Sequence, residues 1–250
     1  MLGTQELGDA DLIVTLLTER HGKVRAVARS ARRSRRRFGG CLEPLTRVQA
    51  TWLEHELRDL GQLEQVEASR SFAEMQADPL RQAACAVLAE VAAGFVHEGQ
   101  ADPQEFRLLA AVLDAIEGGA APWAMLRYFE YWTLRVHGLL PDLASCAGCG
   151  RSLGSARSIR VTLERGPLCS SCLRQAGEQE LRLDPADLEF LEALRRHPPA
   201  ALPGAGPTAR PRAALELLLR GTLEAFAERA FRSYRHFKAR DRFAAGGEGP

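Results

Sequence analysis

Residues 12–30 read LIVTLLTERHGKVRAVARS, and this stretch predicts two strands joined by a tight turn. Its first seven residues are apolar and β-branched, and His21-Gly22 is typical of a turn. The run over residues 23–30 alternates apolar and basic side chains: Val24, Ala26 and Ala28 against Lys23, Arg25 and Arg29. Because successive side chains of a strand point to opposite faces, one face should pack in a core and the other should be cationic.

Two more candidate strands follow within the first 70 or so residues. Val48, Ala50 and Trp52 alternate with polar residues in the third strand. Residues 61–68 supply the fourth, after a charged turn at Arg58-Asp59. Several short antiparallel strands at this spacing are typical of a small closed barrel, so the N-terminal part of the chain is predicted to be a β-barrel.

After Pro79 the apolar period changes from two to about 3.6 residues, which predicts helices. Asp102-Pro103 and Asp184-Pro185 each provide an N-cap followed by proline at the first helical position. The predicted segments are a helix from Pro103 to a stop at Gly118-Gly119, a helix over 122–136, a helix from Pro185 to a stop at Pro198-Pro199, a mobile loop over 198–211 and a last helix over 212–237.

Four of the six cysteines lie close together in the sequence, while Cys41 and Cys85 stand alone. The four are Cys146, Cys149, Cys169 and Cys172, which give C-x2-C, 19 intervening residues and C-x2-C. This spacing is typical of zinc ribbons, and four thiolates fill the coordination shell of zinc. We therefore expect a structural Zn²⁺ ion that holds a fold and does not catalyse a reaction. A redox C-x-x-C pair, an iron–sulfur cluster and coincidence are alternatives that the spacing leaves open.

Positive charge is concentrated in one segment. Residues 20–37 contain eight arginines and Lys23 but no Asp or Glu, although the formal net charge of the chain is only +1. Without those nine cations, 24 basic residues stand against 32 acidic ones, so the near-neutral total hides a strong segregation. Guanidinium groups match phosphate oxygens, and basic strands and loops of small barrels commonly bind nucleic acid. The predicted contact residues are Lys23, Arg25, Arg29, Arg32, Arg33, Arg35, Arg36 and Arg37, with Phe38 stacking on a base.

Two other interpretations of this segment stay open: a solvated, mobile arm, and a patch for an acidic protein tail. A second, weaker basic patch lies near the end of the chain, at Arg229, Arg232, Arg235, His236, Lys238, Arg240 and Arg242. Cations at a helix C-terminus also follow from the helix dipole, so a structural role and DNA contact are equally supported there.

The sequence contains no phosphate-binding-loop, metalloprotease, serine-hydrolase or dinucleotide-binding motif, and its six histidines are isolated from one another. We therefore expect a protein that is not an enzyme. The first residues are acidic and lack the apolar core of a signal peptide, and no apolar run approaches the roughly 20 residues of a membrane helix. These features predict a cytoplasmic protein with reduced thiols and no membrane association.

Several stretches resemble the RecO family of bacterial DNA-repair proteins. They are Leu7–Arg25, RRFGGCLEPL at 36–45, GLLPDLASCAGCG at 138–150 and PLCSSC at 167–172. The resemblance spans nearly the whole chain and implies an α+β protein, with an N-terminal OB-fold β-barrel followed by an all-helical domain that carries an inserted four-cysteine zinc finger. The implied domains are an OB-fold at 1–79, a first helical part at 80–144, the zinc finger at 145–176, a second helical part at 177–243 and a disordered tail at 244–250.

The same resemblance implies binding to single- and double-stranded DNA and annealing of complementary strands. It further implies work with RecR, and with RecF in some settings, to load RecA onto strands coated by single-stranded-DNA-binding protein (SSB). The acidic C-terminal tail of SSB is an expected partner, and the expected location is the cytoplasm, at the nucleoid.

The sequence departs from the family pattern at the N-terminus. Only residues 1–6 precede the segment that begins at Leu7 and continues with Gly8-Asp9-Ala10-Asp11, where the family has a further apolar strand. Two expectations follow as alternatives: a short first barrel strand, or a given start that lies downstream of the natural one. The family has a serine at the position of Ala10, and no role that needs a hydroxyl is expected there.

The residues alone also fit a second class of protein. A zinc-ribbon factor could use the same basic segment on RNA or on a polymerase. A metal-dependent nuclease is the enzymatic alternative, and it predicts strand cleavage when magnesium is added.

Overall fold

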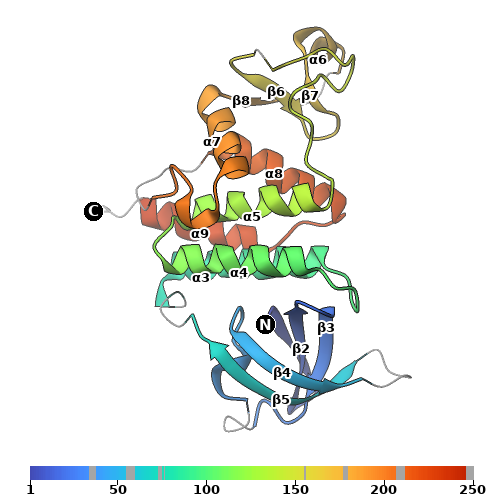
Figure 1. Cartoon of the computed structure of the whole chain (residues 1–250), viewed down its shortest axis with the longest axis vertical. Coiled ribbons are helices and arrows are strands. Elements are labelled where there is room, and N and C mark those ends of the chain that lie inside the picture. The colour runs from blue at the N-terminus through green and yellow to red at the C-terminus, as the bar shows by residue number, and fades with distance from the viewer. Residues whose placement is uncertain are drawn as a thin grey trace. The chain divides into compact units, whose positions relative to one another are not determined.

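The computed structural model describes residues 1–33, 38–54, 60–72, 75, 77–154, 156–176, 180–206 and 212–245. The chain forms two compact units, one made of Met1–Leu113 with Phe231–Pro250 and the other of Asp114–Ala230. The first unit contains a β-barrel and the second contains the four clustered cysteines (Figure 1).

Five strands make the barrel of the first unit, in the order β1-β2-β3-β5-β4. They are β1 (Gly3–Leu7), β2 (Asp11–Thr18), β3 (Gly22–Ala28), β4 (Arg47–Leu53) and β5 (Gly61–Arg70). Neighbouring strands are antiparallel except β3 and β5, which are parallel. Hydrogen bonds from Met1 N to Thr46 O (3.1 Å) and from Leu45 N to Met1 O (2.7 Å) join the two ends of the sheet. This five-stranded barrel is the predicted OB-fold.

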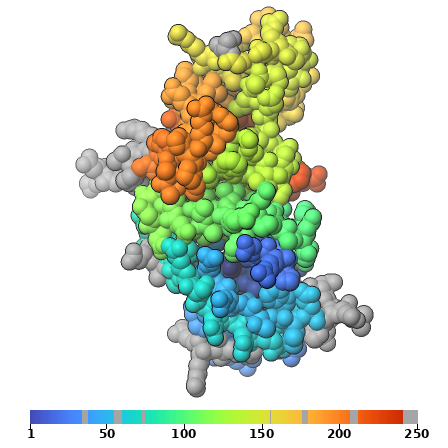
Figure 2. All heavy atoms as spheres, in the orientation of Figure 1, coloured from blue at the N-terminus to red at the C-terminus, as the bar shows by residue number. Residues whose placement is uncertain are grey.

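The strand alternation read from the sequence is confirmed. Val24, Ala26 and Ala28 are buried, whereas Lys23 and Arg25 are half-buried on the other face of β3. The buried side chains from the other strands include Val14, Leu16, Leu63 and Val66. Figure 2 shows the side chains of the strands, coloured blue to teal, gathered in one block. The first strand has five residues, as expected.

Two helices of the first unit, α3 (Pro79–Phe95) and α9 (Ser233–Ala245), pack against each other. The side chain of Asp78 caps α3 by accepting hydrogen bonds from the first-turn backbone. The Phe95 ring lies 6.5 Å from the Phe231 ring, and the Glu90 carboxylate accepts hydrogen bonds from the Arg232 and Ser233 backbone N–H groups. Helix α4 (Pro103–Glu117) begins in this unit and is capped by the Asp102 side chain, as predicted.

The second unit combines helices with a small sheet. Its helices are α5 (Pro122–Val136), α6 (Ser170–Ala176), α7 (Pro185–Arg196) and α8 (Ala213–Phe226). Its strands are β6 (Ile159–Thr162), β7 (Gly166–Leu168) and β8 (Leu181–Leu183), in the order β7-β6-β8. Helix α5 matches its predicted bounds, and Asp184 and Asp187 form a capping box at the start of α7.

A buried ion-pair network ties α5 to α8. The Arg127 guanidinium pairs with Glu130 on the same helix and, at 3.4 Å, with Glu216 on α8. The Arg127 and Glu130 side chains are almost completely buried. Because a buried charge without its partner costs several kcal/mol, roughly 3–5, this network fixes how the two helices pack.

The prediction of one continuous helix over 212–237 is wrong. The structure has α8 and α9 instead, separated by residues 227–232, and Glu228 between them has a left-handed φ of 51°. The chain passes from the second unit to the first at residues 230 and 231. The periodicity continues through this point, so it gave no sign of the break.

The prediction of a mobile loop over 198–211 is also wrong for residues 199–205. Residues 199–201 form a short 3-10 helix, Leu202 and Ala205 are buried, and the Ala121 N–H donates to the Ala205 carbonyl at 2.8 Å. Residues 207–211 lie outside the described part of the chain. Of the predicted tail at 244–250, residues 244 and 245 continue α9 and the remainder is likewise not described. No helix in the described ranges is both long and apolar enough to cross a membrane.

Candidate metal centre and nucleic-acid interface

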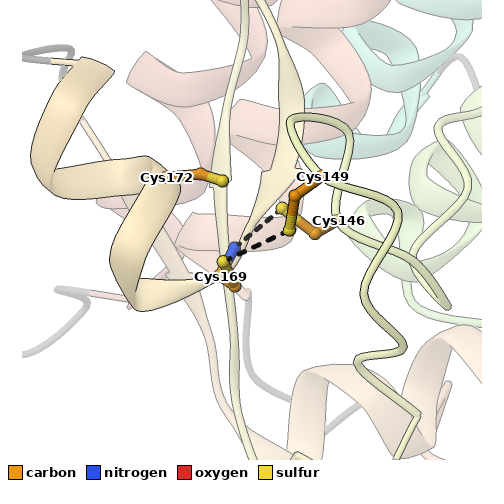
Figure 3. Close-up of side chains that lie close together, drawn as sticks. All are labelled: Cys146, Cys149, Cys169 and Cys172. Atoms are coloured by element: carbon orange, nitrogen blue, oxygen red, sulfur yellow. Dashed lines mark hydrogen bonds between the residues drawn. The ribbon is translucent and has the colours of Figure 1, made fainter.

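Four cysteine side chains from two separate stretches converge in the second unit (Figure 3). Cys146 and Cys149 lie in the loop that follows α5, Cys169 directly precedes α6, and Cys172 lies in the first turn of α6. Their sulfur atoms all lie within 4.8 Å of one another, and the Cys149 and Cys169 sulfurs are 3.8 Å apart. A tetrahedron with metal–sulfur bonds of about 2.3 Å has edges of about 3.8 Å, so this donor set fits a metal ion.

Two glycines let the first cysteine pair approach the second. A side chain at Gly148 would lie 3.0 Å from the Cys172 sulfur and 3.2 Å from its Cβ, so only glycine fits without a shift. Gly150 has a left-handed φ of 71°, and its N–H donates to the Cys146 carbonyl at 2.8 Å. The close approach at Gly148 has no signal in the sequence, because residue 172 is far along the chain.

The thiols differ in how readily they lose a proton. The Cys169 backbone N–H donates to the Cys146 sulfur at 3.2 Å, and this hydrogen bond lowers the pKa of Cys146 to about 6. Hydrogen bonds with the Cys169 and Cys149 side chains raise the pKa of Cys172 to about 12. Crowded thiolates repel one another, so a bound cation is needed for all four sulfurs to be thiolates at neutral pH.

A small apolar cluster supports the cysteines. Leu168 and Leu173 are buried beside Cys146 and Cys169. Between the two cysteine pairs, Ile159 and Val161 are buried in β6. Leu163 lies just beyond β6 and is 48% exposed. The cysteine loop, α6 and the three-stranded sheet are here called the finger, and its strand β8 lies beyond the bounds 145–176 that the sequence predicted.

The basic segment begins where β3 ends. Arg29, Arg32 and Arg33 are exposed there. The Arg32 side chain lies 3.3 Å from a Glu6 carboxylate oxygen, whereas Arg29 and Arg33 have no ion-pair partner within the described ranges. Arg25 lies on β3 itself, 3.8 Å from the Glu98 carboxylate. Arg35, Arg36 and Arg37, also predicted as contacts, lie outside the described residues.

Two of the residues predicted to contact nucleic acid make contacts within the fold itself. The Lys23 ammonium donates to the Ala93 carbonyl in the last turn of α3 at 3.0 Å. Phe38 is only 2% exposed and packs in the barrel core. The expectation that the Phe38 ring stacks on a base is therefore corrected: the ring fills the space between strands and is not accessible to a ligand.

The comparisons with known proteins agree with this geometry. Two family models match, one described as Recombination protein O N terminal over residues 1–72 and the other as Recombination protein O C terminal over residues 76–235. The chain belongs to the RecO family. It is 42% identical to the DNA repair protein RecO of Anaeromyxobacter sp. (strain K) over 172 residues, which cover 69% of this chain and 68% of the relative. It is 36% identical to that of Koribacter versatilis over 206 residues, 81% and 83% of the two chains.

The RecO N-terminal model covers the barrel, and the C-terminal model covers the four cysteines. This RecO family member is thus a DNA repair and recombination protein with an OB-fold and a four-cysteine cluster that could hold a metal ion. Its second basic patch lies mainly on α9, where Arg235, His236 and Arg240 are exposed and Tyr234 and Phe237 are buried. Arg232, just before the helix, is exposed as well.

Proposed function

We propose that this chain is a recombination mediator that works by binding and not by catalysis. In this proposal it binds single- and double-stranded DNA, anneals complementary strands and, with RecR, helps load RecA onto single strands coated by SSB. Membership of a DNA repair family supplies the class of process. The observation that carries the DNA-binding proposal is the pair of exposed cations, Arg29 and Arg33, without ion-pair partners among the described residues.

Charge neutralisation gives this surface a mechanism for annealing. Two DNA strands repel each other through their phosphates, and the repulsion must be reduced before complementary bases can meet. Arginine forks bind phosphate oxygens directly and displace condensed counterions, which needs no nucleotide hydrolysis. The rigid barrel holds β3 in place, so the basic segment is presented from a fixed end of a strand.

The cysteine cluster is proposed to hold one structural Zn²⁺ through Cys146, Cys149, Cys169 and Cys172. The sulfur spacing supports this proposal, because it suits a four-coordinate ion with no open position. A closed site of this kind stabilises the finger and leaves no place for a reactive water. Metal analysis of the purified protein should give about one zinc per chain, and visible absorption from iron–sulfur charge transfer would contradict the assignment.

The partners proposed from the family are RecR, SSB through its acidic tail, RecF in some settings, and RecA indirectly. The location proposed with them is the cytoplasm, at the nucleoid. The protein is proposed to cleave no DNA, so oligonucleotides should stay intact after long incubation with added magnesium.

Annealing of complementary strands precoated with SSB tests the proposed function. The wild type should accelerate annealing, and a variant with Arg32, Arg33, Arg35, Arg36 and Arg37 all replaced by alanine should not. The control variant Arg195→Ala/Arg196→Ala removes two exposed arginines that pair with Glu192 on α7, and it should anneal normally. Equal loss in the control, or preference for structured RNA over DNA, would overturn the proposal.

A further inference from the structure

The finger has a basic face of its own. Five arginines of this region are exposed, and their side chains form no ion pair or hydrogen bond among the residues that the structure describes: Arg151, Arg157, Arg160, Arg174 and Arg182. Between Ser145 and Leu183 the sequence has six arginines against three glutamates, of which Glu164 and Glu180 are described and exposed. This stretch therefore has a formal charge of +3, although Asp142 and Asp184 flank it.

Two of these arginines lie side by side on the sheet. Arg160 on β6 is the direct cross-strand partner of Arg182 on β8, so both side chains leave the same face. The flanking pairs, Ile159 with Leu183 and Val161 with Leu181, leave the opposite face. Like charges directly opposite each other destabilise a sheet, and this cost matters for a sheet of such short strands.

This arginine pair lies on the face of the sheet that bears the cysteines. Leu168 on β7 is the other cross-strand partner of Arg160, so it leaves the same face, and it is buried against Cys146 and Cys169. Arg151 and Arg174 come from the cysteine loop and from α6, the two elements that hold the sulfurs. The exposed arginines of the finger thus come from the cysteine loop, from α6 and from two strands of the sheet.

We propose that this face of the finger binds the phosphate backbone of a single DNA strand. Arg160 and Arg182 leave one face of the sheet side by side, and guanidinium groups bind phosphate oxygens through paired hydrogen bonds. The basic segment after β3 belongs to the first compact unit and the finger to the second. One molecule then holds two strands at once, one on each unit. This inference rests on the proposed function and extends it, because it names a second strand site for annealing.

Energy transfer between two labelled oligonucleotides tests the inference directly. A donor-labelled and an acceptor-labelled oligo(dT), which cannot pair, are mixed with limiting zinc-loaded full-length protein. The wild type should bring the labels together. Arg160→Ala/Arg182→Ala should weaken binding of the second strand roughly tenfold or more, because two charged hydrogen-bond donors are lost. The affinity of this variant for the second strand should also depend less on salt: the slope of log K against log salt should be smaller by about 1.4.

Controls separate the possible outcomes. Arg195 and Arg196 lie in the same unit and both pair with Glu192, so Arg195→Ala/Arg196→Ala should give the same energy transfer as the wild type. Arg160→Lys/Arg182→Lys keeps both positive charges and should keep most of the signal. Unchanged transfer in Arg160→Ala/Arg182→Ala would overturn the inference. So would loss of zinc from that variant, because the arginines would then serve the metal thiolates. If the wild type binds one oligonucleotide without transfer, only this inference fails. If it binds none, the proposed function fails.

Discussion

The Lys23 ammonium group donates a hydrogen bond to the Ala93 carbonyl at 3.0 Å, which ties β3 to the last turn of α3. Carbonyls in the last turn of a helix lack helical partners, and a cation there also interacts favourably with the helix dipole. Lys23 therefore differs from its neighbours Arg29 and Arg33 in the basic segment. The same sequence run contains a residue that holds the fold and residues that are available to a ligand.

Replacing Lys23 by alanine should therefore reduce stability more than DNA binding. We expect a loss of about 1–2 kcal/mol, the value of a partly buried charged hydrogen bond at a helix end. The free energy of unfolding in urea, monitored by hydrogen exchange in α3, measures this loss. Arg29→Ala is the matched control and should change the stability by less than about 0.5 kcal/mol. Full stability in Lys23→Ala would show that the bond to Ala93 contributes nothing.

Phe38→Ala should unfold the barrel more easily without removing a base contact. The ring is 2% exposed in the barrel core, and loss of a buried aromatic side chain costs about 3–5 kcal/mol. Phe38→Leu should cost less because it refills part of the cavity. Binding of single-stranded DNA, measured where each variant is folded, should stay at the wild-type value. A stable Phe38→Ala protein with weak DNA binding would restore the stacking hypothesis.

The sequence predicted the elements whose signals are local. The alternation around Val24 and Ala26 identified β3 and its buried face, and the Asp-Pro caps identified the starts of α4 and α7. The doubled C-x2-C spacing identified the four clustered cysteines because two residues between cysteines suffice to place both sulfurs on one side of a turn. In these cases the deciding contacts lie within a few residues of one another.

Contacts between distant parts of the chain gave no signal in the sequence. Ala93, the partner of Lys23, is 70 residues away, and nothing in the composition of the basic segment indicates it. Phe38 follows a run of arginines, yet its ring packs in the barrel core. The break after α8 occurs at Glu228, without the glycine or proline that usually marks a helix end, because α9 packs on α3 in the other compact unit.

Gly148→Ala should weaken metal binding. The new methyl group would lie 3.0 Å from the Cys172 sulfur, so the cysteine loop must move away from the other pair. We expect zinc affinity to fall about 10–100-fold, as for other changes that displace a ligand, measured by competition with a chromophoric chelator. Gly154→Ala, whose methyl group would lie 3.8 Å from its nearest neighbour, should bind zinc normally. Equal affinities for the two variants would contradict the close-approach argument.

The two lone cysteines should react with thiol reagents at very different rates. Burial raises the pKa of Cys85 to about 12, and because the thiolate is the reactive form, the folded protein should protect it at pH 8. Cys41 is only half-buried and should react first, while bound metal protects the other four. Mass spectrometry after a short maleimide pulse assigns the labelled residue. Labelling of Cys85 as fast as Cys41 in the folded protein would show that this helix opens readily.

The salt dependence of single-stranded DNA affinity tests the central claim, that the basic segment at the end of β3 binds phosphates. If about six cations contact phosphates, log K should fall against log salt with a slope near −4, and Arg29→Ala/Arg33→Ala should reduce that slope by about 1.4. No binding by the zinc-loaded wild type at low salt, or an unchanged slope in the double variant, would contradict the account.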